Sequence, residues 1–168
     1  QLDYKAPQNW NQLNRAGKAK FVRHCLAMAN TKGGYIVVGV AEDRSGRPCL
    51  LKGLTEDQVL SFDPTNVGNF VNRYADPAID FDVVRPLVDN RRYAIFVIRR
   101  FSTLPHVCGY CSENELQQGV FYIRTADAAS RPAYRSSEIH AIVQRSLRNQ
   151  REILGRMLRG ILYEGKYT

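Results

Sequence analysis

Acidic side chains stand at two places in the sequence where they could take part in chemistry at phosphorus. Asp3 comes two residues before Lys5, and Glu42 and Asp43 follow an apolar run. Carboxylates brought together repel one another, and a hard divalent cation such as Mg²⁺ or Mn²⁺ relieves that repulsion. Such a cation activates water for attack at phosphorus, and a nearby lysine neutralises charge on the phosphate. These residues form a candidate catalytic group, although acidic residues at strand ends are often simply solvated.

A second set of candidate ligands lies in a segment that contains two cysteines. Cys108 and Cys111 are separated by two residues, and His106 precedes them. Cys-x-x-Cys beside a histidine is typical of a structural zinc site, which needs four donors, and Cys49 is the candidate for the fourth. The pair could instead form a redox couple or two unreactive thiols, and the spacing leaves these alternatives open.

A glycine-containing turn and two distant arginines could bind phosphate. Residues 30–34 read Asn-Thr-Lys-Gly-Gly, and turns of this kind expose backbone N–H groups. Lys32, Arg124 and Arg131 would supply the positive charge for contacts with a nucleic-acid backbone. Tyrosines near them could stack on bases or could pack in the core: Tyr122 and Tyr134.

The composition favours a polyanionic partner. The chain has 168 residues, 24 Lys and Arg against 16 Asp and Glu, and a net charge of +8. This excess favours RNA, DNA or an acidic surface, although a basic protein without such a partner is also consistent with it. No apolar run is long enough to span a bilayer, so no membrane association is expected. Four cysteines without a small secreted framework favour reduced thiols and a cytoplasmic location. The chain starts at Gln1, so it could be trimmed from a longer protein.

The elements that must position these side chains alternate between helices and strands. An apolar stripe over residues 14–29 predicts a helix, and the β-branched run over residues 35–40 predicts a strand buried on both faces. Turn residues separate the remaining elements. We expect an entry strand near residues 2–5, a short hairpin strand at 49–51, helices from Thr55 and Thr65, a strand at 120–125, and loops at 101–118 and 126–134. Strands at 79–88 and 92–100 should be antiparallel and joined by a hairpin turn at Asp89-Asn90-Arg91.

The last part of the chain predicts one long amphipathic helix from residue 136 to about 163. Apolar or neutral side chains recur there at three- and four-residue steps: Ile139, Val143, Leu147, Gln150, Leu154, Met157 and Ile161. Arginines line another face: Arg145, Arg148, Arg156 and Arg159. Such a helix would be roughly 40 Å long, more than a small sheet needs for cover. It could pack on a second subunit, giving a homodimer, or on a further domain, or it could simply cover the sheet.

Three of these motifs, taken in order, resemble the divergent Alba-like domain of Schlafen proteins and many bacterial proteins. They are Asp3-Tyr4-Lys5, the stretch from Ala27 to Asp43 that contains Ala-Asn-Thr-Lys-Gly-Gly, and the segment Val120 to Thr125 with Arg131-Pro132 after it. The resemblance runs from about residue 2 to about residue 138. It implies an α+β fold of the Alba-like type, in which helices pack on a mixed sheet and the long helix follows.

The resemblance also implies a function. Family members with ribonuclease activity use an acidic triad, in which Asp3 and Glu42 match two positions, although the two acid types are exchanged here. The third acid would precede Gln1. It implies that Asp3 and Glu42 hold Mg²⁺ or Mn²⁺, that Lys5 acts on the phosphate, and that Asp43 is in reserve.

We therefore expect a nucleic-acid-binding domain over residues 1–138 and a basic helix over residues 139–168. The leading function is binding of RNA or DNA, with metal-dependent endoribonuclease activity on tRNA or other structured RNA as its catalytic form. One alternative is a non-catalytic DNA- or RNA-binding module of a transcriptional regulator or defence protein. Another is a protein-interaction or dimerisation domain.

Overall fold

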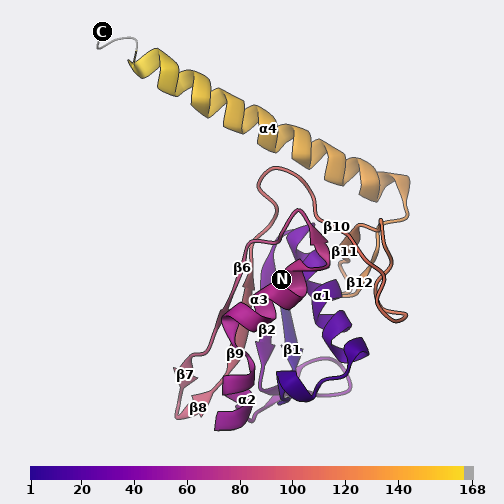
Figure 1. Ribbon diagram of the computed structural model, residues 1–168, viewed down its shortest axis with the longest axis vertical. Helices are drawn as coiled ribbons and strands as arrows, with labels where there is room; N and C mark the ends of the chain where they lie inside the picture. The colour runs from indigo at the N-terminus through magenta and orange to yellow at the C-terminus, as the bar shows by residue number, and fades with distance from the viewer. Residues whose placement is uncertain (165–168) are drawn as a thin grey trace.

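The computed structural model describes residues 1–164, with side chains up to residue 161, and is built around one four-stranded sheet. The strand order is β1 (Leu2–Lys5), β2 (Gly34–Val38), β9 (Ala94–Ile98) and β6 (Phe81–Val84). β1 runs parallel to β2, whereas β9 is antiparallel to both β2 and β6 (Figure 1). The expected α+β class with a mixed sheet is confirmed.

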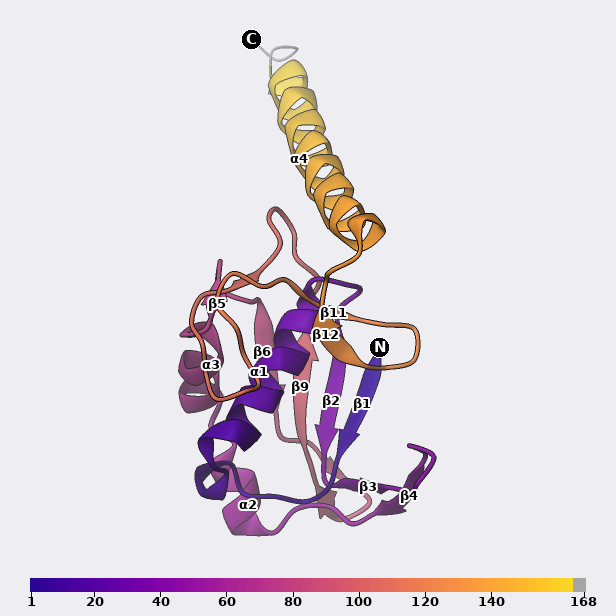
Figure 2. The ribbon, with the colours of Figure 1, turned by 90° about the vertical axis from the view of Figure 1, so that its right-hand side faces the viewer.

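The helices of the domain gather on one side of this sheet. α1 (Arg15–Ala29) lies in front of the strands in Figure 2, with α3 (Pro64–Asn72) beside it. α2 (Glu56–Ser61) and the 3-10 helix η1 (Trp10–Gln12) contact each other near the start of α1. The opposite side of the sheet carries no helix. The domain is therefore an open two-layer structure rather than a closed sandwich.

Local chemistry explains where these helices begin. The side chain of Asn14 accepts a hydrogen bond from the backbone N–H of Gly17, at the start of α1. Thr55 and Gln58 form a capping box at the start of α2, in which each side chain is bonded to the backbone of the other residue. Such caps satisfy N–H groups that have no partner inside the helix. Both starts were expected from the sequence.

The core lies between the sheet and the helices. Ile36, Val38 and Phe96 point toward α1 and are fully buried. Trp10 closes one end, where its ring meets the ring of Phe21 edge-on at a centroid distance of 5.6 Å. Burial of this apolar and aromatic surface is the main source of the stability of the domain.

The strand expected over residues 35–40 is wrong in its extent and in its burial. β2 ends at Val38, because the next residue, Gly39, has a φ of +116° that glycine adopts readily. A side chain at position 39 would also meet the ring of Tyr93. β3 (Val40–Glu42) then leaves the main sheet and pairs with β4 (Pro48–Leu51) in a separate hairpin. Tyr35 is exposed rather than buried, because no element covers that side of the sheet.

Two of the expected loops contain short strands. β10 (Val107–Cys108) lies within the expected loop 101–118 and pairs with β5 (Ala75–Asp76). β12 (Ser130–Pro132) lies within the expected loop 126–134 and pairs with β11 (Tyr122–Arg124), so β11 does not join the main sheet. Strands of two or three residues carry too little alternation to be read from a sequence.

The hairpin expected between the strands over residues 79–88 and 92–100 is confirmed. β7 (Leu87–Val88) pairs with β8 (Arg91–Arg92) across the two-residue turn of Asp89 and Asn90. Both turn residues have positive φ, the conformation that a tight two-residue hairpin turn requires.

The long C-terminal helix is also confirmed, as α4 (Ser136–Glu164), while residues 165–168 of the expected range lie outside the described part of the chain. Its first half is fixed to the domain. The guanidinium of Arg145 donates to the backbone carbonyls of Asn30 and Thr31 at the end of α1, where a helix favours positive charge. Ile142 is buried in the same contact.

The second half of α4 projects away from the domain (Figure 1). Large apolar side chains on it are more than half exposed: Leu154, Met157, Leu158 and Ile161. No helix within the described residues is long and apolar enough to cross a membrane.

Candidate functional site

Asp3 and Lys5, the first predicted site residues, lie together on β1 in a largely buried ionic network. Asp3 faces the helix side of the sheet because it pairs in register with Ile36. Its Oδ1 accepts a hydrogen bond from Nη2 of Arg124 at 3.0 Å. Its Oδ2 lies 2.9 Å from Lys5 Nζ in an ion pair. Burial alone would raise the pKa of Asp3, but Lys5, together with His24 and Arg124, holds that pKa below its ordinary value.

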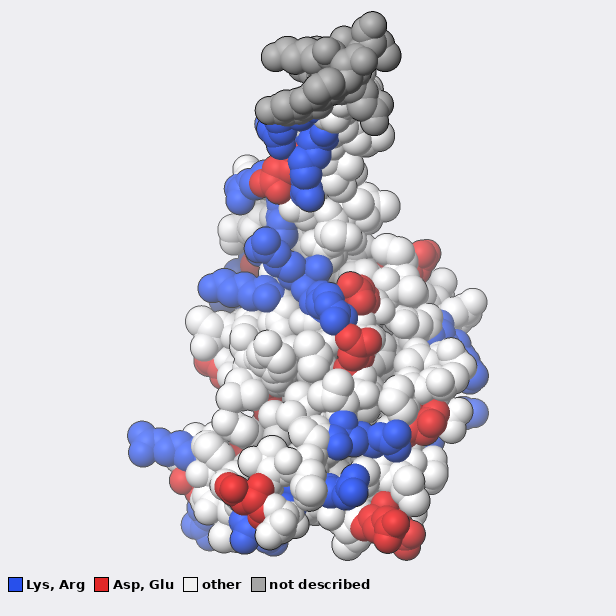
Figure 3. Space-filling view, turned by 90° about the vertical axis from the view of Figure 1, so that its left-hand side faces the viewer, with Lys and Arg blue, Asp and Glu red and all other residues white. Residues whose placement is uncertain are grey.

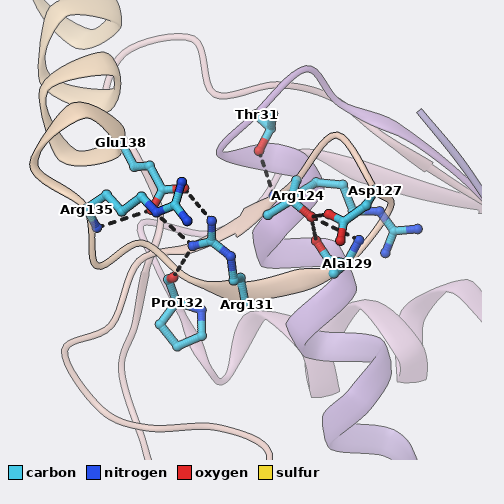
Figure 4. Close-up of polar contacts among 9 residues, drawn as sticks. Thr31, Arg124, Asp127, Ala129, Arg131, Pro132, Arg135 and Glu138 are labelled. Carbon is cyan, nitrogen blue, oxygen red and sulfur yellow. Dashed lines mark hydrogen bonds and ion pairs between the residues drawn. The ribbon is translucent and has the colours of Figure 1, made fainter.

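Arg124 is the centre of this network, and its side chain is only 3% exposed. Its Nη1 donates to the hydroxyl of Ser130 at 2.9 Å, and that hydroxyl lies 2.8 Å from Nδ1 of His24. Its backbone N–H donates to Thr31 Oγ1 (Figure 4). Arg124 therefore connects β1, α1, β11 and β12. In this arrangement its guanidinium is occupied by protein groups and does not face a phosphate ligand.

His24 is held in its neutral form within the network. Burial and the neighbouring charge of Lys5 lower its pKa to about 3, although Asp3 acts in the opposite direction. Nη1 of Arg124 lies 3.2 Å from Nδ1 of His24, and a guanidinium N–H can only donate. Nδ1 is therefore the acceptor nitrogen of the neutral ring, and the hydroxyl of Ser130 donates to it.

Arg131, on β12, is joined to the beginning of α4. Its two terminal nitrogens reach the two carboxylate oxygens of Glu138 at 3.0 Å and 2.6 Å, as Figure 4 shows. Its guanidinium lies 4.5 Å from the ring centre of Tyr134. A two-pronged contact of this kind fixes geometry as well as charge. Arg131 thus positions α4, whereas Lys32, just after α1, is exposed to solvent.

This pair gives a prediction about acid. The hydrogen bonds from Arg131 lower the pKa of Glu138 to about 2, from an ordinary value of 4.5. A carboxyl group whose folded pKa is lowered stabilises the protein above its unfolded pKa, and that stabilisation is lost as the pH falls toward the folded value. We expect Glu138→Gln to lower the melting temperature at pH 6 and to have little effect near pH 2. Circular dichroism melts of both proteins at the two pH values measure this, and an equal effect at both would contradict it.

Glu42 and Asp43 lie on the separate β3–β4 hairpin. Asp43 Oδ1 accepts hydrogen bonds from the backbone N–H groups of Ser45 and Arg47 and from the Ser45 hydroxyl, so it stabilises the turn. These hydrogen bonds, from the Ser45 hydroxyl first, lower its pKa. Glu42 is exposed to solvent.

Only half of the predicted divalent-cation site is assembled. Asp3 and Lys5 lie together, whereas Glu42 and Asp43 lie on the β3–β4 hairpin. Both oxygens of Asp3 already face cations, Lys5 and Arg124. Among residues 1–161, whose side chains the structure describes, no three His, Cys, Asp or Glu side chains are placed to share a metal ion. The present arrangement of donors does not fit Mg²⁺ or Mn²⁺, which prefer several oxygen ligands, and no reaction step through a metal is derived from it.

The predicted zinc ligands are distributed over two regions. His106 is buried, its Nδ1 lies 2.6 Å from the carbonyl oxygen of Pro77, and burial lowers its pKa. Cys108 is buried and Cys111 exposed nearby, whereas Cys49 lies on the β3–β4 hairpin and donates to its neighbouring strand. Structural zinc stays a prediction.

A group of arginines without ion pairs lies elsewhere, at the top of the domain in Figure 3. We call it the arginine ridge, and it consists of Arg100, Arg148, Arg151, Arg156 and Arg159. None of them forms an ion pair in the part of the chain that the structure describes. Burial and the nearby charges of Arg100 and Arg148 lower the pKa of Arg145, which shows that like charges gather there.

Most of the ridge lies along one face of α4. The side chains of Arg148, Arg151, Arg156 and Arg159 lie around that of Glu152, and the space between them is open to solvent. The spacing of the arginines on the expected helix was visible in the sequence, but its position beside Arg100 was not. This surface, rather than Arg124 and Arg131, presents unpaired positive charge to a ligand.

Comparison with known proteins places this geometry in a family. The family model described as "Schlafen, AlbA_2" matches residues 1–133. The crystal structure of the DIP2311 protein from Corynebacterium diphtheriae is 21% identical over 82% of this chain, with a TM-score of 0.52. It shows the fold, and this chain spans only 22% of its length.

A second solved structure is similar at a lower level. It is the solution structure of the N-terminal domain of a protein from Nitrosomonas europaea described as related to the ATP-dependent DNA helicase RecG. The identity is 16%, covering 80% of this chain and 84% of that one, with a TM-score of 0.39. A search of curated proteins gave no significant match.

Proposed function

The chain belongs to the Schlafen AlbA_2 family, and we propose that it binds the phosphate backbone of nucleic acid through the arginine ridge. The observation that carries this proposal is the set of five arginines that have no carboxylate partner among the side chains of residues 1–161. Lys32 adds a further exposed charge near the end of α1, which carries the first half of α4.

The physical basis of this binding is release of counterions. Unpaired arginines that gather on one surface repel one another, and a polyanion relieves that repulsion. Each arginine that neutralises a phosphate displaces a condensed cation, so affinity falls steeply as salt rises. The net charge of +8 adds long-range attraction.

The buried network has a positioning role in this proposal. Arg124 holds β11 and β12 against α1, and Arg131 then connects β12 to Glu138 on α4. Arg145 fixes α4 to the end of α1. The first half of α4, which carries Arg148, is therefore held in place, and this lowers the entropy cost of binding there.

A metal-dependent endoribonuclease is the second candidate, and one observation favours it. Asp3 is a largely buried carboxylate whose Oδ2 lies 2.9 Å from Lys5 Nζ, and metal-assisted attack at phosphorus uses a carboxylate with a lysine in this way. In this candidate Asp3 and Glu42 would hold Mg²⁺ or Mn²⁺, and Lys5 would act on the phosphate. The hairpin that carries Glu42 would have to approach Asp3 when RNA binds.

One experiment separates binding from cleavage. Labelled tRNA, single-stranded RNA and duplex DNA are incubated with the wild type and with Asp3→Asn/Glu42→Gln, with and without Mn²⁺. Retention of substrate on a native gel with no cleavage supports the binding function alone. Mn²⁺-dependent cleavage that the double variant loses while it still binds would establish the nuclease. Absence of binding to all three substrates would reject the proposal and favour a protein-interaction domain. Circular dichroism of the double variant checks that it is folded.

A further inference from the structure

The side of the main sheet opposite the helices is apolar, aromatic and open. We call it the open face. Pairing register places its side chains in two rows, because residues directly opposite each other point to the same side. Its apolar and aromatic members are Leu2, Tyr4, Tyr35, Val37, Val84, Ile95 and Val97, and Asp82 ends the row of Leu2, Tyr35 and Val97. Tyr35 is 51% exposed and Leu2 48%. The solvated face of a sheet is usually polar, so an exposed apolar and aromatic patch on it points to a binding surface.

Two tyrosines on adjacent strands give this face a specific chemistry. Tyr35 on β2 pairs with Leu2 on β1, and Tyr4 pairs with Val37, so the tyrosines are diagonal neighbours. Diagonal side chains on a sheet are about 7–8 Å apart, within reach of large aromatic groups. Bases stack on exposed aromatic rings of sheets in proteins that bind single strands. Two neighbouring rings of this kind offer stacking surfaces for two consecutive bases.

Charge around the open face matches a nucleic acid. Gly34, the residue before Tyr35, pairs with Ile98, and the chain then continues into Arg99 and Arg100. The arginine ridge therefore begins at the Tyr35 end of the face. Figure 3, which views the molecule from this side, shows an uncharged area below the Lys and Arg side chains.

Acidic charge at the edge of the open face is neutralised. Asp82 lies on β6, opposite Val97, and Arg99 Nη2 donates to it at 2.7 Å. A second bond joins Arg99 to Asp80 at 3.1 Å. Because Arg99 neutralises these two carboxylates, they repel a polyanion less than unpaired carboxylates would.

From this arrangement we infer that the open face binds unpaired bases of a single-stranded nucleic acid, which stack on Tyr35 and Tyr4 while the arginine ridge holds the phosphates. The inference rests on the proposed function and names its substrate class. Duplex bases are already stacked on one another and cannot offer a free face, so the platform selects single strands. Four strands at a spacing of about 4.8 Å give room for two to three nucleotides across the face.

The test compares tyrosine variants in binding to labelled oligo-uridine, oligo-deoxythymidine and a duplex of equal length. We expect Tyr4→Ala/Tyr35→Ala to lower affinity for the single strands by about tenfold or more, because each stacked base contributes substantially to binding. Tyr4→Phe/Tyr35→Phe keeps the rings and should bind within about twofold of the wild type. Tyr110→Ala removes a tyrosine that is 62% exposed outside the open face and serves as the matched control.

Other outcomes have distinct meanings. Unchanged single-strand affinity of the alanine variant, in a protein that still binds through the arginine ridge, would overturn the platform and leave the proposed function standing. No binding by the wild type would overturn both. A dimer that Tyr35→Ala dissociates without a change in binding would overturn the platform in favour of a second copy on the open face. As a second measurement, photocrosslinking with 5-iodouridine should label Tyr35 or Tyr4, and labelling confined to other residues would contradict the inference.

Discussion

Replacement of Arg148, Arg151, Arg156 and Arg159 by glutamine is expected to lower affinity for nucleic acid by about a hundredfold at ~0.1 M salt. These four side chains carry four of the five charges of the arginine ridge, and each would contact about one phosphate. Their loss should also make the salt dependence shallower, by roughly 3 in the log–log slope on single strands. The fold should be unaffected, because these side chains are exposed and have no ion pair among the described residues.

The matched control removes the same charge from other parts of the surface. Arg44, Arg47, Arg73 and Arg85 are exposed and likewise form no ion pair with the side chains that the structure describes, those of residues 1–161. If binding depends on the position of the charge, Arg44→Gln/Arg47→Gln/Arg73→Gln/Arg85→Gln should lose far less affinity than the ridge variant. Fluorescence anisotropy at several salt concentrations compares them. Equal losses in the two variants would show that only net charge matters and would reject the ridge as a site.

Replacement of Arg124 by glutamine is expected to lower the free energy of unfolding by about 3 kcal/mol. The substitution leaves the carboxylate of Asp3, whose side chain is 14% exposed, without its buried partner. It also removes the hydrogen bond to Ser130 that holds β12. Removal of one member of a buried ion pair costs more than the pair contributes, because the remaining charge stays desolvated. Urea unfolding followed by circular dichroism measures the change.

The double variant isolates the ion pair itself. Asp3→Asn/Arg124→Gln should be less destabilised than the sum of the two single variants, because it removes both members of the buried pair, while the loss of the Lys5 partner is shared with Asp3→Asn and cancels. Arg131→Gln, on the more exposed contact with Glu138, provides the comparison and should cost less. Strict additivity of Asp3→Asn and Arg124→Gln would show that the two side chains do not interact in the folded protein.

The parts of the fold that depend on local chemistry were predictable from the sequence. Asn14 and Thr55 mark helix starts through their own side chains, and Asp89-Asn90 marks a tight turn. Glycine at position 39 was read as part of a strand, because the close approach of Tyr93 that requires it comes from another part of the chain.

The candidate site was predictable only in part, for a physical reason. Asp3 and Lys5 are close in the sequence, and they lie together in the structure. The partner of Asp3 is 121 positions away, and no local pattern shows that Arg124 is buried against it. The sequence likewise predicts a phosphate contact for Arg131, because no local pattern shows that Glu138 binds its guanidinium. The arginine ridge combines arginines of α4 with Arg100. They come together because Arg145 packs α4 against the end of α1, which the sequence does not show.

The most direct test of nucleic-acid binding is a salt titration of the wild-type chain. A fluorescein-labelled single-stranded RNA of twelve uridines is titrated at salt concentrations from about 50 to 300 mM, and the dissociation constant is read from anisotropy. We expect micromolar binding at the lowest salt and a log–log slope of about −3, as four or five phosphate contacts require. Absence of binding at the lowest salt, or an affinity that does not change with salt, would contradict the account.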